Sequence, residues 1–318
     1  MDKAEFAALL YERLLSQASV PDQGTDGMRL MQLMAGMLTE TVLLFDDPDM
    51  GLDKSICDLI ELLNCMPAEG DLAVDALPPP YIIDYETEQG RGLARDIFEE
   101  WLECAYQFHE LLIFMIHNMI VKMEQHGQPR EEVLRIFMEC AARCLAYELA
   151  AQELCDVVIE RNIGAQGWTL SESVSGLSAI SGRYLALSHN ACSLVSVPSL
   201  PDKLDQVSYV MTQEAVRLGI PAGTDWRFGI AANDYPPNAP YDLIHNLEPA
   251  CQTFFNAINL YDYFDRSVAC AKAAGRMLAV ASGGKEPELE PVIGKPLAMA
   301  AMLETYKSVC QSGVIASC

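Results

Sequence analysis

The feature that most constrains the fold is a pair of long amphipathic segments between residues 92 and 163. In each segment apolar residues recur at steps of three and four, which places them on one face of an α-helix. The segments are joined by a short turn, His126 to Pro129. Gly127 suits the left-handed residue that ends a helix, and Pro129 suits the first turn of the next. The sequence therefore predicts an antiparallel helical hairpin over residues 92–163.

Helical patterns also flank this hairpin on both sides. Apolar spacing predicts helices over residues 2–18, 28–45, 202–218, 246–281 and 297–311. Thr169-Leu170-Ser171-Glu172 has the form of a capping box, which predicts a helix that starts there and runs to about residue 195. Strand patterns are nearly absent. We expect an all-α fold, an irregular multi-helix bundle built around the hairpin.

Three parts of the chain differ in composition. Residues 1–66 hold acidic helices, residues 67–91 form a proline-rich linker that we expect to pack on the body, and residues 92–318 form the main bundle. We expect the first and third parts to make one compact unit. Residues 164–182 are rich in serine and glycine, which predicts either close helix packing through small side chains or a mobile lid.

The net charge of −24 is placed unevenly. Residues 1–182 hold 32 acidic and 11 basic residues, a net charge of −21, whereas residues 183–318 hold 13 and 10. Nucleic-acid binding and anionic membranes are disfavoured, because both require a basic surface. The acidic segment between Glu40 and Glu88 predicts either a solvated face or a docking face for a basic protein. Its candidate docking residues are Asp46, Asp47, Asp49 and Asp53.

The segment Phe45-Asp46-Asp47-Pro48-Asp49-Met50 resembles the first aspartate-rich motif of prenyl-diphosphate synthases and terpene cyclases. The resemblance implies aspartates that hold magnesium against a diphosphate. This segment departs from the family pattern at Pro48, which breaks the helix on which the motif lies. A second aspartate-rich helix at the family's spacing is also missing. We therefore interpret Asp46 to Asp49 as a turn that ends a helix.

Two places are candidates for binding. The irregular stretch 219–241 is long enough to be functional, although its aromatic residues can also pack over helix ends. In the hairpin, folding about residues 127 and 128 places His109 and Glu110 of one helix level with Tyr147 and Glu148 of the other. Burial of these polar side chains would favour a functional site there. The candidates are Trp226, Phe228, Tyr235 and Tyr241 in the loop, and His109, Glu110, Tyr147 and Glu148 in the hairpin, where Glu103 and His117 share the stripe of Glu110.

Metal and catalytic signatures are missing from the sequence. The eleven cysteines are scattered and form no CxxC pair, so we expect reduced thiols in the core. The Glu-x-x-His step that di-iron bundles carry on two helices does not occur, and neither do P-loop, HExxH or GxSxG motifs. We therefore assign no catalytic residue, metal or cofactor, and favour a protein that is not an enzyme.

These patterns lead to two hypotheses of different class. The first is a soluble, cytoplasmic, acidic helical scaffold or binding protein that docks a basic protein partner or self-assembles as an oligomer. We expect no secretory signal, because the sequence starts with acidic residues and no apolar run. We expect no membrane insertion, because the run Leu111 to Val121 is too short to span a bilayer. The alternative is a helical enzyme or small-molecule-binding protein, with a pocket between helical hairpins covered by the 219–241 loop.

Overall fold

The structure is a computed structural model of the whole chain. It describes residues 19–20, 24–25, 143, 146–164, 167–191, 200–225, 240–258, 260–283 and 287–312. The chain divides into two units, Met1–Leu145 and Ala146–Cys318, and all the helices named below belong to the second. The expected boundaries at residues 66 and 91 lie outside the described residues. None of the described helices is long and apolar enough to cross a membrane.

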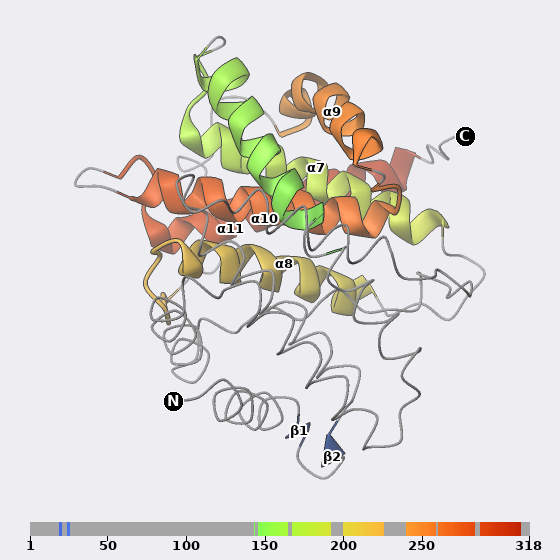
Figure 1. Cartoon of the computed structure of the whole chain (residues 1–318), viewed down its shortest axis with the longest axis horizontal. Helices are drawn as coiled ribbons and strands as arrows, with labels where there is room; N and C mark the ends of the chain where they lie inside the picture. Colours follow the sequence, from blue (N-terminus) through green and yellow to red (C-terminus); the bar gives the residue numbers. More distant parts are fainter. Residues whose placement is uncertain are drawn as a thin grey trace, which may run out of the picture. The chain divides into compact units, whose positions relative to one another are not determined.

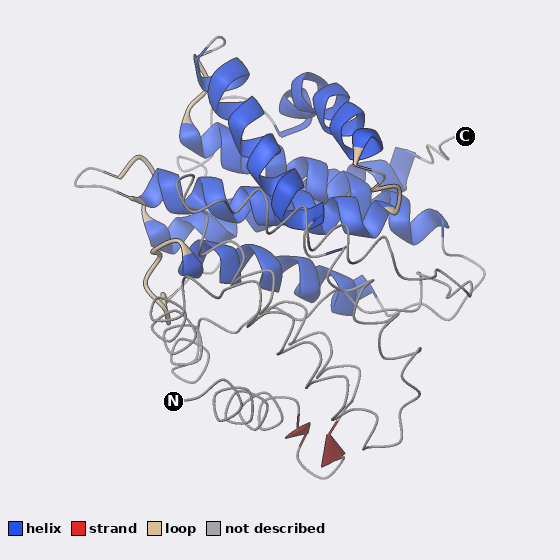
Figure 2. Ribbon diagram, in the orientation of Figure 1, coloured by secondary structure: helices blue, strands red, loops and turns tan. Residues whose placement is uncertain are grey.

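The second unit is all-helical in its described part, which confirms the expected fold class (Figure 1, Figure 2). Residues 146–157 are α-helical and continue into a π-helix, η4 (Val158–Gly164). This is the end of the expected hairpin's second helix; the turn and the first helix of the hairpin lie outside the described residues. The further helices are α7 (Leu170–Ala191), α8 (Leu200–Arg217), α9 (Pro240–Ala257), α10 (Tyr263–Ser282) and α11 (Pro291–Ser312).

In the first unit the structure describes a short strand pair between the ranges 2–18 and 28–45 that were expected to be helical. β1 (Ser19–Val20) pairs antiparallel with β2 (Gly24–Thr25), with Ser19 opposite Thr25 and Val20 opposite Gly24.

Helix α7 is the central element of the second unit, because it packs against α9, α10 and α11. It begins where the capping box predicts. The Thr169 backbone N–H donates to Glu172 Oε2 at 2.8 Å, and the Glu172 N–H donates to Thr169 Oγ1 at 3.1 Å. This reciprocal pair satisfies two N–H groups that a helix start leaves without partners.

Small residues let α7 approach its neighbours closely, as the serine- and glycine-rich stretch predicted. A Cβ atom on Gly182 would lie 2.1 Å from the carbonyl oxygen of Met302 in α11. Toward α10, Ser181 Oγ donates to the Ser267 carbonyl and Ser267 Oγ donates to the Ser181 carbonyl, both at 2.8 Å. The lid alternative is wrong for residues 170–182, which are helical and mostly buried.

The single helix expected over residues 246–281 is wrong, because the structure has two helices, α9 and α10, with a turn between them. Apolar residues continue at helical spacing across the turn, so the pattern alone does not show the break. A new helix starts after Asp262, whose side chain accepts a hydrogen bond from the Asp265 N–H at 2.9 Å and caps α10. Arg266 then reaches back to the turn, donating from Nε to the Leu260 carbonyl at 2.7 Å.

Helix α11 also differs from the expectation, because it starts at Pro291 rather than near Leu297. Proline is favoured in a first helical turn, and Pro296 lies inside the helix. Packing explains why the helix starts early: Ile293 and Leu297 are buried, and a Cβ atom on Gly294 would lie 2.1 Å from Leu278 Cδ1 of α10. Burial of this first turn outweighs the unfavourable internal proline.

Candidate functional site

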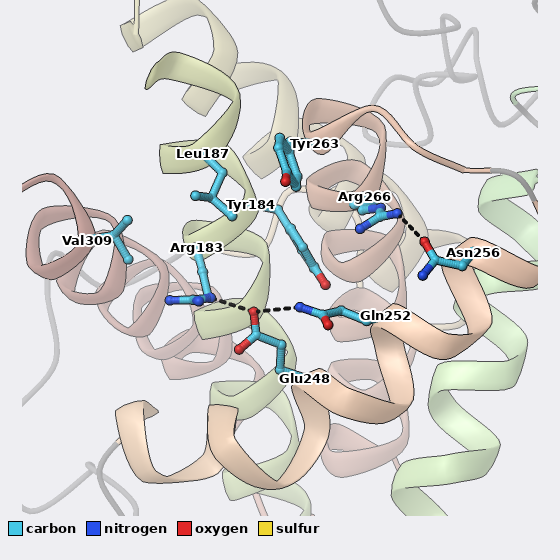
Figure 3. A pocket seen from close by; sticks show the side chains of 9 residues that line it. All are labelled: Arg183, Tyr184, Leu187, Glu248, Gln252, Asn256, Tyr263, Arg266 and Val309. Atoms are coloured by element: carbon cyan, nitrogen blue, oxygen red, sulfur yellow. Dashed lines mark hydrogen bonds and ion pairs between the residues drawn. The ribbon is translucent and has the colours of Figure 1, made fainter. Parts of the chain in front are cut away.

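A cavity of about 260 Å³ lies between α7, α9, α10 and α11 (Figure 3). Its volume lies slightly below that of most ligand pockets, which measure about 300–1,000 Å³. One ion pair, one further arginine, two amides and two phenol rings meet aliphatic side chains around it. The residues that line it are Arg183, Tyr184, Leu187, Glu248, Gln252, Asn256, Tyr263, Arg266 and Val309.

One side of the cavity is an ion pair between α7 and α9. Arg183 Nε donates to Glu248 Oε1 at 2.5 Å, and the two side chains are 27% and 15% exposed. Gln252, one helical turn further along α9, donates to the same Oε1 at 3.4 Å. Glu248 is therefore held by one charged and one amide donor. Because the pair is partly exposed, its value to stability is small, and its effect is to orient the polar wall of the cavity.

The opposite side is formed by Arg266, which is 7% exposed. Besides its bond to Leu260, it donates from Nη2 to Asn256 Oδ1 at 2.8 Å. The guanidinium carbon also lies 5.5–5.8 Å from the ring centroids of Tyr184, Phe255 and Tyr263. Such cation–π contacts are strongest where the cation is desolvated. Arg266 is thus fixed in place at the junction of α9, α10 and the turn between them.

Tyr184 places a buried hydroxyl beside the cavity. Its side chain is 1% exposed and packs edge-on against Phe255 and stacked on Tyr263, with centroids 5.7 and 6.2 Å apart. Its buried hydroxyl has no hydrogen-bond partner in the described part of the chain, and it points toward the side of α9 that carries Gln252 (Figure 3). Leaving a buried hydroxyl without a partner costs about 1–3 kcal/mol.

The phenol of Tyr184 stays protonated. Burial raises the pKa of Tyr184 well above its ordinary value, and the neighbouring Cys270, Cys251 and Glu248 raise the pKa further, while Arg266 opposes them. A neutral phenol can both donate and accept one hydrogen bond. The cavity therefore offers a fixed hydroxyl whose bonding capacity no described protein atom uses.

A second polar feature is a buried charge cluster, which we define as Glu148, Glu214, Arg217, Lys272 and Arg276. Glu148 forms ion pairs with Lys272 and Arg276, while Glu214 is paired with Arg276 Nε and Arg217 Nη2, each at 2.6 Å. Lys272 Nζ lies 3.7 Å from Glu214 Oε2. Both carboxylate side chains are 3% exposed. The cluster joins residues 146–157 to α8 and α10.

The predicted site residues fall in different places. Tyr147 and Glu148 are buried but lie in the helix core, where Tyr147 donates to Asp265 Oδ1 at 2.5 Å and Glu148 belongs to the charge cluster. Tyr241 belongs to α9, so the end of the 219–241 stretch is helical. The remaining candidates lie outside the described residues: Asp46, Asp47, Asp49, Asp53, Glu103, His109, Glu110, His117, Trp226, Phe228 and Tyr235.

The residues that line the cavity were not predicted from the sequence, although the sequence holds one pattern that includes some of them. Glu248, Gln252 and Asn256 recur at steps of four on α9, a polar stripe beside buried Cys251 and Phe255. Such a stripe usually faces water, and Gln252 and Asn256 are indeed exposed, so the pattern on α9 alone does not indicate a cavity. Its partners Arg183, Tyr184 and Arg266 come from other helices, so only the tertiary structure brings the set together.

Three of the four described cysteines lie in the core, as the sequence predicted, and the fourth does not. Cys155, Cys251 and Cys270 are free and buried, and Cys310 is free and exposed. Burial raises the pKa of Cys155 to about 12, and its thiol donates to the Ala273 carbonyl at 3.6 Å. A thiol held in this way is a packing group rather than a nucleophile at neutral pH. Over the described ranges, no group of three or more acidic, histidine or cysteine side chains is placed to hold a metal ion.

Comparison with known protein families, with curated proteins and with solved structures finds no match to this chain.

Proposed function

We propose that this protein binds a small molecule in the cavity between α7, α9, α10 and α11. The observation that carries the proposal is the Tyr184 hydroxyl, which is buried beside a cavity and has no described partner. Buried polar groups in proteins are nearly always hydrogen-bonded. A ligand oxygen or nitrogen seated in the cavity supplies the missing partner, and the converging polar groups of α9 orient it.

The mixture of apolar and polar side chains that line the cavity supports this proposal. Ligand pockets combine an apolar lining with a few fixed polar groups, and here Leu187, Val309 and the Tyr263 ring accompany the polar side chains. Arg183 and Arg266 are held by protein partners before any ligand arrives. Binding therefore requires little ordering of side chains, which favours affinity.

The test is a screen of anionic, cationic and neutral small molecules by ligand-observed NMR on the full chain. Leu187→Trp places an indole at the cavity, and Leu204→Trp makes the same change at a half-buried position of α8 that does not line it. We expect at least one compound to bind the wild type and the Leu204 variant, and to bind the Leu187 variant about tenfold or more weakly. A screen without any such compound would overturn the proposal.

Tyr184→Phe is a second variant that removes the hydroxyl and keeps the ring. Because the hydroxyl has no described partner, we expect the free protein to be at least as stable as the wild type in chemical denaturation. The compound found in the screen should bind this variant more weakly. A marked loss of stability would show that the hydroxyl already has a protein partner, and would remove the main support for the pocket.

We retain a second proposal from the charge distribution, that the acidic segment between Glu40 and Glu88 docks a basic protein or mediates self-association. Its support is the concentration of thirteen acidic residues and one basic residue in this segment. Association through exposed charges weakens as salt rises, because ions screen them. Binding of a basic polypeptide such as polylysine should therefore fall steeply between low and physiological salt. Association that does not require Lys or Arg residues in the partner and does not change with salt concentration would contradict this second proposal.

A further inference from the structure

We infer that the ligand of the cavity is a small organic monocarboxylate, an inference that rests on the proposed small-molecule function. The first argument is charge. Two guanidinium groups, Arg183 and Arg266, and one carboxylate, Glu248, line the cavity, and no other charged residue of the described ranges does. The lining therefore carries a surplus of one positive charge, which a monoanion balances. A cationic ligand would add a second uncompensated charge in a partly buried place.

The second argument is the remaining hydrogen-bonding capacity. Glu248 Oε1 already accepts from Arg183 and Gln252, and Asn256 Oδ1 accepts from Arg266. Because a guanidinium only donates, that bond also fixes the Asn256 amide with its NH₂ group turned away from Arg266. Figure 3 shows the second oxygen of Glu248 on the side away from Tyr184.

Donors are therefore in excess near Tyr184. Within the described residues, three donors lack a protein acceptor: the buried Tyr184 hydroxyl, Nη1 of Arg266 and the NH₂ group of Asn256, whose side chain is exposed. Gln252 Oε1 is a remaining acceptor. Two carboxylate oxygens provide about four acceptor positions. An ionised acceptor also makes the stronger class of hydrogen bond. The acceptor-rich group that fits this set is a carboxylate.

The third argument is the rest of the lining. Leu187, Val309 and the ring of Tyr263 give the cavity an apolar side, which suits the carbon skeleton of an organic acid. Inorganic phosphate has no apolar part to cover these side chains, and its charge at neutral pH exceeds the single surplus. The cavity volume of about 260 Å³ limits the acid to a small one.

The experiment is isothermal titration calorimetry of the full chain with acetate, lactate, hexanoate and benzoate. Each acid is compared with its own carboxamide, which has nearly the same shape without the charge, and inorganic phosphate is included. We expect at least one acid to bind about tenfold or more tightly than its amide and than phosphate. That affinity should fall with increasing salt.

Asn256→Asp tests the site itself. The aspartate keeps an oxygen that accepts from Arg266, and so keeps the turn, but it replaces the donor NH₂ by a negatively charged oxygen. We expect the carboxylate to bind about tenfold or more weakly. Asn246→Asp is the matched control, because Asn246 is exposed on α9 like Asn256 but does not line the cavity. Its affinity should stay within about twofold of the wild type.

Several outcomes would overturn the inference: equal binding of acids and amides, tighter binding of phosphate, no binding of any of the acids, or wild-type affinity in Asn256→Asp. These failures are separable from failure of the pocket. A neutral or cationic compound that binds the wild type and is blocked by Leu187→Trp would leave the small-molecule function standing while excluding the monocarboxylate.

Discussion

Replacing Gly182 by alanine is expected to lower the free energy of unfolding by about 3 kcal/mol, at the upper end for overpacked cores. The added Cβ would lie 2.1 Å from the Met302 carbonyl oxygen and 2.8 Å from its carbonyl carbon. These are backbone atoms of α11 and cannot rotate away, so the two helices must separate. Urea denaturation of the full chain measures the effect.

Gly176→Ala is the matched control on the same helix. Its nearest neighbour would be Leu247 Cδ1 at 3.2 Å, the end of a side chain that can adjust. Alanine in place of glycine also favours the helix by about 1 kcal/mol. We therefore expect a change within about 1 kcal/mol of the wild type. Equal losses in the two variants would show that close approach at Gly182 is not what holds α7 against α11.

Glu214→Gln is expected to cost about 3–5 kcal/mol, because it removes the charge that balances buried cations. Glu214 accepts from Arg276 Nε at 2.6 Å and from Arg217 Nη2 at 2.6 Å, and Lys272 Nζ is 3.7 Å away. Glutamine has nearly the same size as glutamate, so packing is kept and the loss of stability measures the effect of removing the charge. After the change, Glu148 would be the single carboxylate of the charge cluster.

The control for this variant is Glu153→Gln, the same substitution at an exposed position of the helical segment 146–157. Exposed substitutions of this kind usually change stability by less than about 0.5 kcal/mol. Both variants are measured by chemical denaturation with circular dichroism. Similar stabilities for the two variants would mean that the charge cluster is solvated in solution rather than buried.

Local signals in the sequence predicted local features of the second unit well. The Thr169 and Glu172 pair marks the start of α7 and makes the reciprocal bonds of a capping box. Small residues around Gly182 predicted a close helix crossing. In both cases the chemistry that sets the structure lies within a few neighbouring residues, so a pattern can reveal it.

Long-range contacts could not be predicted in this way. Lys272 and Arg276, four residues apart on α10, resemble a solvated helix face and are buried only because they meet Glu148 and Glu214. The break between α9 and α10 depends on Arg266, whose bonds to Leu260 and Asn256 close the turn. The cavity combines side chains of four helices. The Tyr184 hydroxyl beside it is notable because it has no hydrogen-bond partner among the described residues, and no sequence pattern predicts such a group.

The most direct test of the pocket is a crystal structure of the full chain with the compound that binds most tightly. The account predicts that the compound occupies the cavity between α7, α9, α10 and α11. One of its polar atoms should lie about 3 Å from Tyr184 Oη, within hydrogen-bonding distance. A compound bound elsewhere beside an empty cavity would contradict the account, as would a protein side chain that fills the cavity and bonds to Tyr184 Oη.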